Sequence, residues 1–98
     1  LDKNLINDYR YSEAYVVARK RKGFGPKKIV YELISRGINE NTASEVINIE
    51  GGWHDAALKA FNKKYKVGIG KDFKEQNKQK VFLQNRGFSF EEIDSVFS

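Results

Sequence analysis

The sequence of 98 residues contains no cysteine, a single proline and a single histidine. Without cysteine the chain has no disulfide framework and no thiolate zinc site, and one histidine cannot complete a metal site or a nucleophilic triad. No apolar run approaches membrane-spanning length, and nothing resembles a secretory signal peptide. We therefore expect no metal, no cofactor, no membrane contact and a reducing, cytoplasmic location.

The sequence also lacks complete phosphate-binding fingerprints. Gly23-Phe24-Gly25 has no third glycine and no preceding strand, and Gly70-Lys71 has neither the glycine five residues before it nor the hydroxyl residue after the lysine. The carboxylates at 91–94 are explained by a helix start, where the dipole favours negative charge. Because nucleophile, base and pocket signatures are missing, we expect a protein that is not an enzyme.

What the sequence does contain is one phrase written twice, fifty residues apart: L-I-S-R-G-I at 33–38 and L-Q-N-R-G-F at 83–88. Aligned without a gap, residues 28–47 and 78–97 share five identities in twenty positions. A repeat at this spacing indicates one structural unit that is used more than once.

The repeated phrase predicts a helix stop followed by a restart. Glycine tolerates the left-handed conformation that ends many helices, so Gly37 and Gly87 should lie just past a helix end. In a Schellman motif the next residue packs back on the helix, which pairs Ile38 with Leu33 and Phe88 with Leu83. Asn39 and Ser89 are good N-caps for the helix that follows, and Ser89 with Glu92 has capping-box spacing.

Apolar periodicity and turn residues predict six helices in two sets of three, and no strand. We place them at about 8–21, 26–36 and 39–50 in a unit of residues 1–50, and at about 53–66, 72–86 and 89–97 in a unit of residues 51–98. Asp8 is a plausible cap for the first helix, and Pro26 suits the first turn of the second. The expected fold is all-α: tandem three-helix repeats forming an elongated, curved array.

The net charge of the chain is +5, and basic and acidic segments alternate along the sequence in step with the repeat. Residues 9–28 carry seven basic side chains against one acidic, and residues 59–80 carry eight against two, while the segments after them are acidic. A basic cluster can be a merely solvated face, but these two fall on equivalent helix ends. We therefore predict a binding surface for phosphates or an acidic protein groove. Its candidate residues are Arg10, Arg19, Lys20, Arg21, Lys22, Lys27, Lys28, Lys63, Lys64 and Lys66.

Several short motifs in this order resemble the bacterial RecX regulatory proteins. They are D-Y-R-Y-S-E at 8–13, K-G-F-G-P at 22–26, E-L with R-G-I at 32–38, K-K-Y at 63–65, and F-L with R-G-F and E-I at 82–93. The resemblance covers nearly the whole chain and matches the second and third of the family's three-helix repeats. A first repeat is not represented, and the chain begins at Leu1. We therefore expect a fragment of a longer protein.

The resemblance implies a function that composition does not supply. RecX proteins bind the RecA recombinase and its filament on DNA, and they usually restrain its ATP hydrolysis, strand exchange and coprotease activity. For this chain we expect a monomer whose partner is the RecA filament, with single- or double-stranded DNA as a secondary contact. An alternative is a basic helical module that binds DNA directly, although the final helix of each unit is acidic and phosphates would repel it. A third reading is a helical scaffold without a specific ligand.

Overall fold

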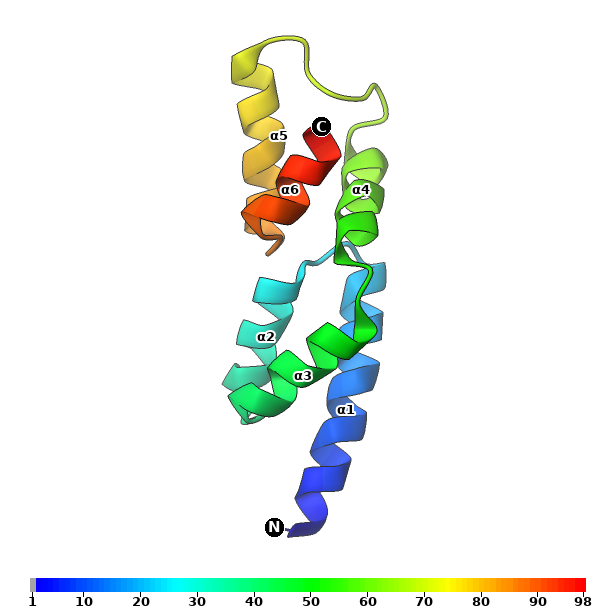
Figure 1. The fold of residues 1–98 in the computed structure, drawn as a ribbon, viewed down its shortest axis with the longest axis vertical. Coiled ribbons are helices and arrows are strands. Elements are labelled where there is room, and N and C mark those ends of the chain that lie inside the picture. Colours follow the sequence, from blue (N-terminus) through cyan, green and yellow to red (C-terminus); the bar gives the residue numbers. More distant parts are fainter. Residues whose placement is uncertain (1) are drawn as a thin grey trace.

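The computed structural model describes the backbone of residues 2–98 and the side-chain surroundings of residues 8–98. Within these residues the chain forms six helices and no strand, so the all-α prediction is confirmed (Figure 1). The helices are α1 (Asp2–Arg21), α2 (Pro26–Ser35), α3 (Glu40–Glu50), α4 (Trp53–Lys64), α5 (Phe73–Asn85) and α6 (Phe90–Phe97).

Two predicted helix ends are wrong. The first helix begins at Asp2 instead of Asp8, and the Ser12 hydroxyl donates to the Asp8 carbonyl at 2.7 Å, four residues back along the same helix. Residues 2–7 contain no glycine or proline, so nothing in the sequence interrupts the helix before Asp8. The fourth helix ends at Lys64 instead of 66, because Tyr65 leaves the helical region with φ −115° and ψ 83°. The other ends lie within one residue of the prediction.

The predicted helix stops are confirmed. The amides of Ile38 and Phe88 donate to the carbonyls of Leu33 and Leu83 at 3.0 and 3.2 Å, as a Schellman motif requires. The intervening glycines, Gly37 and Gly87, have φ values of +93° and +98°.

The restarts also follow the prediction. The Asn39 side chain accepts from the Asn41 amide at 2.7 Å, and both bonds of the Ser89–Glu92 capping box are present. Pro26 occupies the first turn of α2 with Gly25 as its N-cap. Local sequence therefore determines where most helices stop and start.

Helix packing occurs mainly within two sets, α1–α3 and α4–α6, which correspond to the proposed units 1–50 and 51–98. In each set the third helix, α3 or α6, crosses in front of the other two (Figure 1). Four residues on one face of α4, Trp53, Ala57, Ala60 and Phe61, are buried, and Tyr65, just beyond its end, is half-buried. The Trp53 indole donates to the Ile47 carbonyl at 2.9 Å, which ties the start of α4 to the end of α3.

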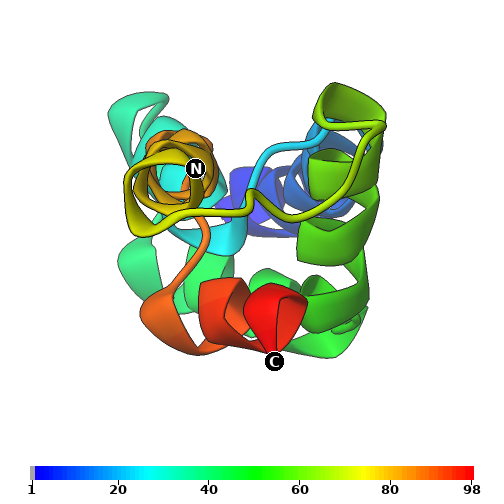
Figure 2. The same cartoon turned by 90° about the horizontal axis from the view of Figure 1, so that it is seen from above.

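The two units stack end to end, α5 over α2 and α4 over α1, into a rod of 53 × 17 × 17 Å (Figures 1 and 2). Seen from above, α3 and α6 lie on one side of the rod (Figure 2). The predicted elongation is confirmed. The curvature stays a prediction, because two units are too few to define it.

Backbone contacts join the units. The Gly25 amide donates to the Arg86 carbonyl at 2.7 Å, and the Lys27 amide donates to the Gly87 carbonyl at 3.0 Å. The amino end of α2 thus meets the carboxyl end of α5, so the free amides of one helix satisfy the free carbonyls of the other and their dipoles align. No side chain fits between them: a Cβ on Gly25 would lie 2.5 Å from the Gly87 carbonyl carbon, and one on Gly87 would lie 2.4 Å from the Lys28 Cβ.

None of the helices within residues 2–98 combines the length and the apolar composition that crossing a membrane requires.

A matched pair of glycine substitutions separates the contribution of the junction to stability from that of the turn. Both Gly37→Ala and Gly87→Ala place a side chain at positive φ, which costs about 1–2 kcal/mol. Only Gly87→Ala also meets neighbouring atoms, whereas a Cβ on Gly37 has nothing within 4 Å. We expect G87A to lower the free energy of unfolding by about 1–3 kcal/mol more than G37A, measured by urea denaturation. Equal losses would contradict the packed junction.

Candidate functional site

Two of the predicted binding residues, Arg19 and Lys20, are engaged inside the molecule. Arg19 Nε and Nη2 lie 3.0 and 2.8 Å from the two carboxylate oxygens of Glu32, an ion pair between α1 and α2. The guanidinium also lies 3.8 Å from the centroid of the Phe24 ring. Arg19 therefore fixes the Gly23–Pro26 loop against its own unit and is half-buried.

Lys20 holds the connection between the units. Its Nζ lies 3.1 Å from Glu50 Oε2, 2.7 Å from the Gly51 carbonyl oxygen and 5.2 Å from the centroid of the Trp53 ring. The ammonium thus neutralises the carboxylate at the end of α3 and satisfies a carbonyl of the linker. Only 22% of its side chain is exposed, so little of it remains for a partner.

The Glu32 carboxylate accepts hydrogen bonds from Arg19 and Tyr15 in the first unit. Burial acts to raise its pKa, but the hydrogen bonds from Arg19 and Tyr15 outweigh burial and hold the pKa below the ordinary value of 4.5. Burial and the bond that its hydroxyl donates to Glu32 raise the pKa of Tyr15. The Glu32 carboxylate therefore stays ionised at neutral pH. Its ion pair orients the Arg19 guanidinium, which contacts Phe24 in the Gly23–Pro26 loop.

The exposed cations gather in a groove where the units meet. A hollow of about 440 Å³ lies between the end of α1, the linker and α4, and a second of about 210 Å³ lies between the loop, α4 and α5. Both hollows are lined by Gly23, Ala60 and Lys63, so they form one continuous surface, which we call the junction groove. Its basic side chains are Lys20, Arg21, Lys22, Lys59, Lys63, Lys64 and Arg86.

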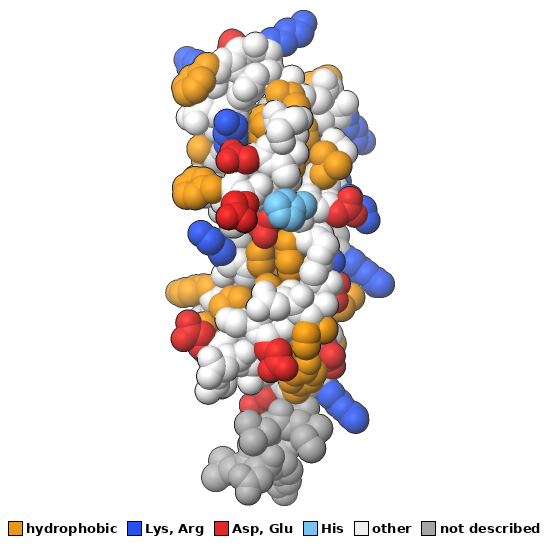
Figure 3. Space-filling model, in the orientation of Figure 1, with side chains coloured by type: hydrophobic (Ala, Val, Ile, Leu, Met, Phe, Trp, Pro, Cys, Tyr) orange, Lys and Arg blue, Asp and Glu red, His pale blue; other side chains and the backbone are white. Residues whose placement is uncertain are grey.

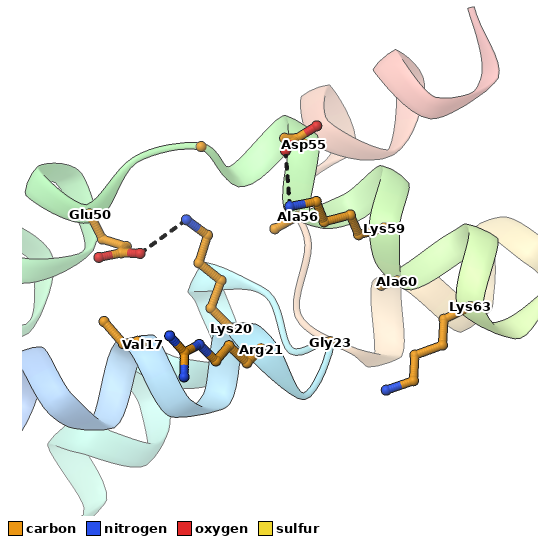
Figure 4. A pocket seen from close by; sticks show the side chains of 11 residues that line it. Val17, Lys20, Arg21, Gly23, Glu50, Asp55, Ala56, Lys59, Ala60 and Lys63 are labelled. Carbon is orange, nitrogen blue, oxygen red and sulfur yellow. Dashed lines mark hydrogen bonds and ion pairs between the residues drawn. The ribbon is translucent and has the colours of Figure 1, made fainter.

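The groove has few acidic side chains of its own. Glu50 is paired with Lys20, and Asp55 lies 3.5 Å from Lys59 Nζ. Figure 4 shows these pairs, with Arg21 and Lys63 on either side of Gly23. Within the described residues, no ion pair engages the exposed cations Arg21, Lys22, Lys63 and Lys64.

Two groove residues were missed by sequence reasoning. The Arg86 guanidinium lies 4.9 Å from the Phe24 ring centroid and donates to the Lys22 carbonyl at 3.3 Å, although the R-G phrase indicated only helix closure. Lys59 stands four residues before Lys63, and this helical spacing could have identified it. Arg86 could not be placed from sequence, because Phe24 and the Lys22 carbonyl, which bring it to the groove, belong to the other unit.

The remaining predicted residues lie elsewhere. Arg10 is exposed on α1 and Lys66 is exposed in the loop after α4. Lys27 lines a separate hollow with Gln84, Gly87, Phe88 and Phe90, and Lys28 packs against Gly87. Of the predicted residues, the structure therefore brings together Arg21, Lys22, Lys63 and Lys64 as exposed cations and leaves Arg10, Lys27, Lys28 and Lys66 outside the groove.

The face formed by α3 and α6 has a different character. Acidic side chains lie over these helices, and most lysine and arginine side chains in this view project from the edges (Figure 3). This arrangement agrees with the acidic segments that follow each basic one in the sequence. The molecule thus presents an acidic face beside a basic groove.

Comparison with known proteins identifies relatives along almost the whole chain. Residues 7–47 match the second three-helix domain of RecX, and residues 54–97 match the third. The chain is 31% identical to Regulatory protein RecX of Cronobacter sakazakii over 98% of its own length and 59% of the relative. It is 37% identical to the protein of that name in Chromohalobacter salexigens (94% of the chain, 60% of the relative) and in Legionella pneumophila (93% and 61%). The chain therefore spans about three fifths of the length of these relatives.

The Glu32 ion pair predicts a defined dependence of stability on pH. A carboxylate whose pKa is lowered by folding stabilises the fold above its unfolded pKa, and this contribution is lost as the pH falls through the folded value. We expect Glu32→Gln to lower the free energy of unfolding by about 1–2 kcal/mol at pH 7 and by less at pH 3, which lies below the ordinary pKa of 4.5, so that part of the stabilisation by the carboxylate charge is lost. Urea denaturation at the two pH values measures the difference.

The exposed pair at the groove supplies the control. Asp55 and Lys59 are 69% and 80% exposed, so Asp55→Asn should change stability at pH 7 by less than about 0.5 kcal/mol. A Glu32→Gln effect that persists unchanged at pH 3 would show that the carboxylate charge is not its source.

Proposed function

This chain belongs to the RecX family of regulatory proteins, and from that premise we propose that it binds the RecA filament on DNA and restrains RecA activity. The activities in question are ATP hydrolysis, strand exchange and the coprotease function. We further propose that the junction groove provides the main contact. In this proposal the chain acts as a binding regulator without chemistry of its own.

The observation that carries the assignment is the set of four exposed, unneutralised cations in the groove. Arg21 and Lys22 come from the end of α1, and Lys63 and Lys64 come from the last turn of α4. A concave surface with one sign of charge attracts an extended partner of the opposite sign and speeds its association. A recombinase filament presents DNA phosphates together with protein, which suits a basic groove beside an acidic face.

The stiffness of the junction supports the same proposal. Two backbone hydrogen bonds and a close glycine contact hold the units, while Lys20 fixes the linker. Because the cations of α1 and α4 are already aligned, binding does not require them to be ordered first. A rod 53 Å long can also contact more than one subunit of a helical filament.

Direct DNA binding by a single inserted helix is the alternative. It finds less support, because the last helices of the units carry Glu91, Glu92 and Asp94 in α6 and Glu40, Glu45 and Glu50 in α3. Phosphates repel such helices. The junction groove could still contact phosphates without inserting a helix, and its contribution can be measured separately.

Charge reversal in the groove tests the proposal. With bacterial RecA on single-stranded DNA, the unmutated chain should lower the rate of ATP hydrolysis. We expect the variant Arg21→Glu, Lys22→Glu, Lys63→Glu to need at least about tenfold more protein for the same effect, since three lost charge contacts exceed about 1.4 kcal/mol. Circular dichroism should show unchanged helix content.

A matched variant separates the groove from overall charge. Lys71→Glu, Lys74→Glu, Lys78→Glu alters three exposed lysines just before and along the first half of α5, outside the groove. Each triple reversal removes six charge units from +5 and leaves −1. The control should stay within about twofold of the unmutated chain. Equal losses would assign the effect to net charge, and no binding of filament by the unmutated chain would refute the proposed function.

A comparison of binding to naked DNA and to RecA-coated DNA distinguishes the proposed function from direct DNA binding. If DNA alone accounts for the interaction, the affinity for naked strands should equal that for RecA-coated strands and fall steeply with salt. We expect weaker binding to the naked strands, because the filament adds protein contacts. Fluorescence anisotropy of labelled DNA with and without RecA measures both.

A further inference from the structure

The smaller hollow of the junction groove, of about 210 Å³, is basic throughout: among the described residues, none that lines it is acidic. Its basic side chains come from three segments that lie far apart in the sequence, the ends of α1, α4 and α5. They are Lys22, Lys63, Lys64 and Arg86. The other lining residues, with Ala60 and Phe82 among them, carry no charge. The hollow therefore gathers positive charge without a counter-charge of its own.

The larger hollow of the groove differs in this respect. Glu50 and Asp55 line it, and they lie 3.1 and 3.5 Å from the ammonium groups of Lys20 and Lys59 (Figure 4). In the part of the chain that the structure describes, no ion pair engages the four cations of the smaller hollow. Like charges gathered in this way repel one another, so all four favour the entry of an anion.

The Arg86 guanidinium is held in position by the fold itself. Its Cζ lies 4.9 Å from the centroid of the Phe24 ring and 5.0 Å from that of the Phe82 ring, and Nη1 donates to the Lys22 carbonyl at 3.3 Å. Lys64 Nζ lies 5.8 Å from the same Phe82 ring centroid, so two cations stand beside one ring. The guanidinium has further N–H donors in a planar fork that matches phosphate oxygens. Because it is already positioned, little entropy is lost when it binds them.

The size and the charge of the hollow indicate the class of its ligand. Pockets for drug-sized molecules enclose about 300–1,000 Å³, so this smaller hollow suits a compact anion. A single carboxylate cannot neutralise four cations, whereas linked phosphates carry several negative charges on oxygens that accept from both lysine and arginine. In a DNA strand the charges are spread along the backbone, so fewer of them fit into one hollow.

We propose that the smaller hollow binds a short chain of linked phosphates, such as inorganic tripolyphosphate or the triphosphate of a nucleotide, and that this ligand competes with the filament for the groove. The site recognises the phosphates alone and takes both sources. Binding of the phosphate chain stands independently of the function proposed above, whereas the competition rests on it. Soluble phosphate chains would then regulate how much of the groove is open to the filament.

Calorimetric titration of the 98-residue chain tests the site. At about 0.15 M ionic strength, tripolyphosphate should bind one-to-one and at least about tenfold more tightly than orthophosphate, because it makes more charge contacts. Metal-free ATP should bind within about threefold of tripolyphosphate, since the hollow contacts only phosphates. Orthophosphate or citrate binding as tightly as tripolyphosphate would overturn the proposal. An ATP affinity outside the threefold range would overturn recognition of the phosphates alone.

Matched lysine substitutions locate the site. The variant Lys63→Gln, Lys64→Gln removes two exposed cations of the hollow, and Lys71→Gln, Lys74→Gln removes two exposed lysines outside it, with the same change in net charge. We expect the first variant to lose at least about tenfold in tripolyphosphate affinity and the second less than about twofold. Circular dichroism should show equal helix content, because all four side chains are exposed. Equal losses of affinity would place the phosphates elsewhere.

Competition is measured separately, on RecA filaments assembled on single-stranded DNA with magnesium in excess. Tripolyphosphate should displace the bound chain at least about twofold more than sodium chloride of the same ionic strength, because salt only screens the groove. Tripolyphosphate that binds the chain but displaces no more of it than salt would overturn the competition. If the chain binds tripolyphosphate but no filament, the proposed function and the competition fail together, and the phosphate site stands.

Discussion

The close approach of Gly25 to Gly87 is the contact on which the rest of the structure depends. It allows the first amides of α2 to donate to the last carbonyls of α5, so two helices that are distant in sequence continue one another in space. A side chain at either position would separate the backbones and break both hydrogen bonds. The groove exists because this contact holds the ends of α1 and α4 beside each other.

The basic residues near the junction fall into two groups: some pair with carboxylates inside the fold, and others are exposed to solvent. Arg19 and Lys20 face carboxylates that the fold brings within 3.1 Å, and their charges are used to position the loop and the linker. Arg21 and Lys22, the next two residues along the chain, face solvent in the groove. The exposed cations therefore begin where the internal ion pairs end, and a run of cations in sequence does not by itself locate that point.

The two ends of the rod show how similar units acquire different roles. Both carry the R-G turn and a glycine loop, yet Gln79 replaces an apolar core position and satisfies the second loop internally. A buried glutamine is unfavourable unless its amide is fully bonded, and here the Gln79 amide is bonded to the Gly70 amide and the Gly68 carbonyl.

Local features were read correctly from the sequence: the helix class, the Schellman stops at Gly37 and Gly87 and the Ser89 capping box. These depend on residues within about one helical turn of each other, so spacing alone determines them. The start of α1 was misjudged, because Asp8 has the chemistry of a cap without its context. Only the tertiary structure decided that Arg86 and Lys59 join the groove, that the charges of Arg19 and Lys20 are paired with carboxylates inside the fold, and that Gly87 serves the junction as well as the turn. Each of these outcomes depends on atoms from segments far apart in the chain, whose proximity no local pattern encodes.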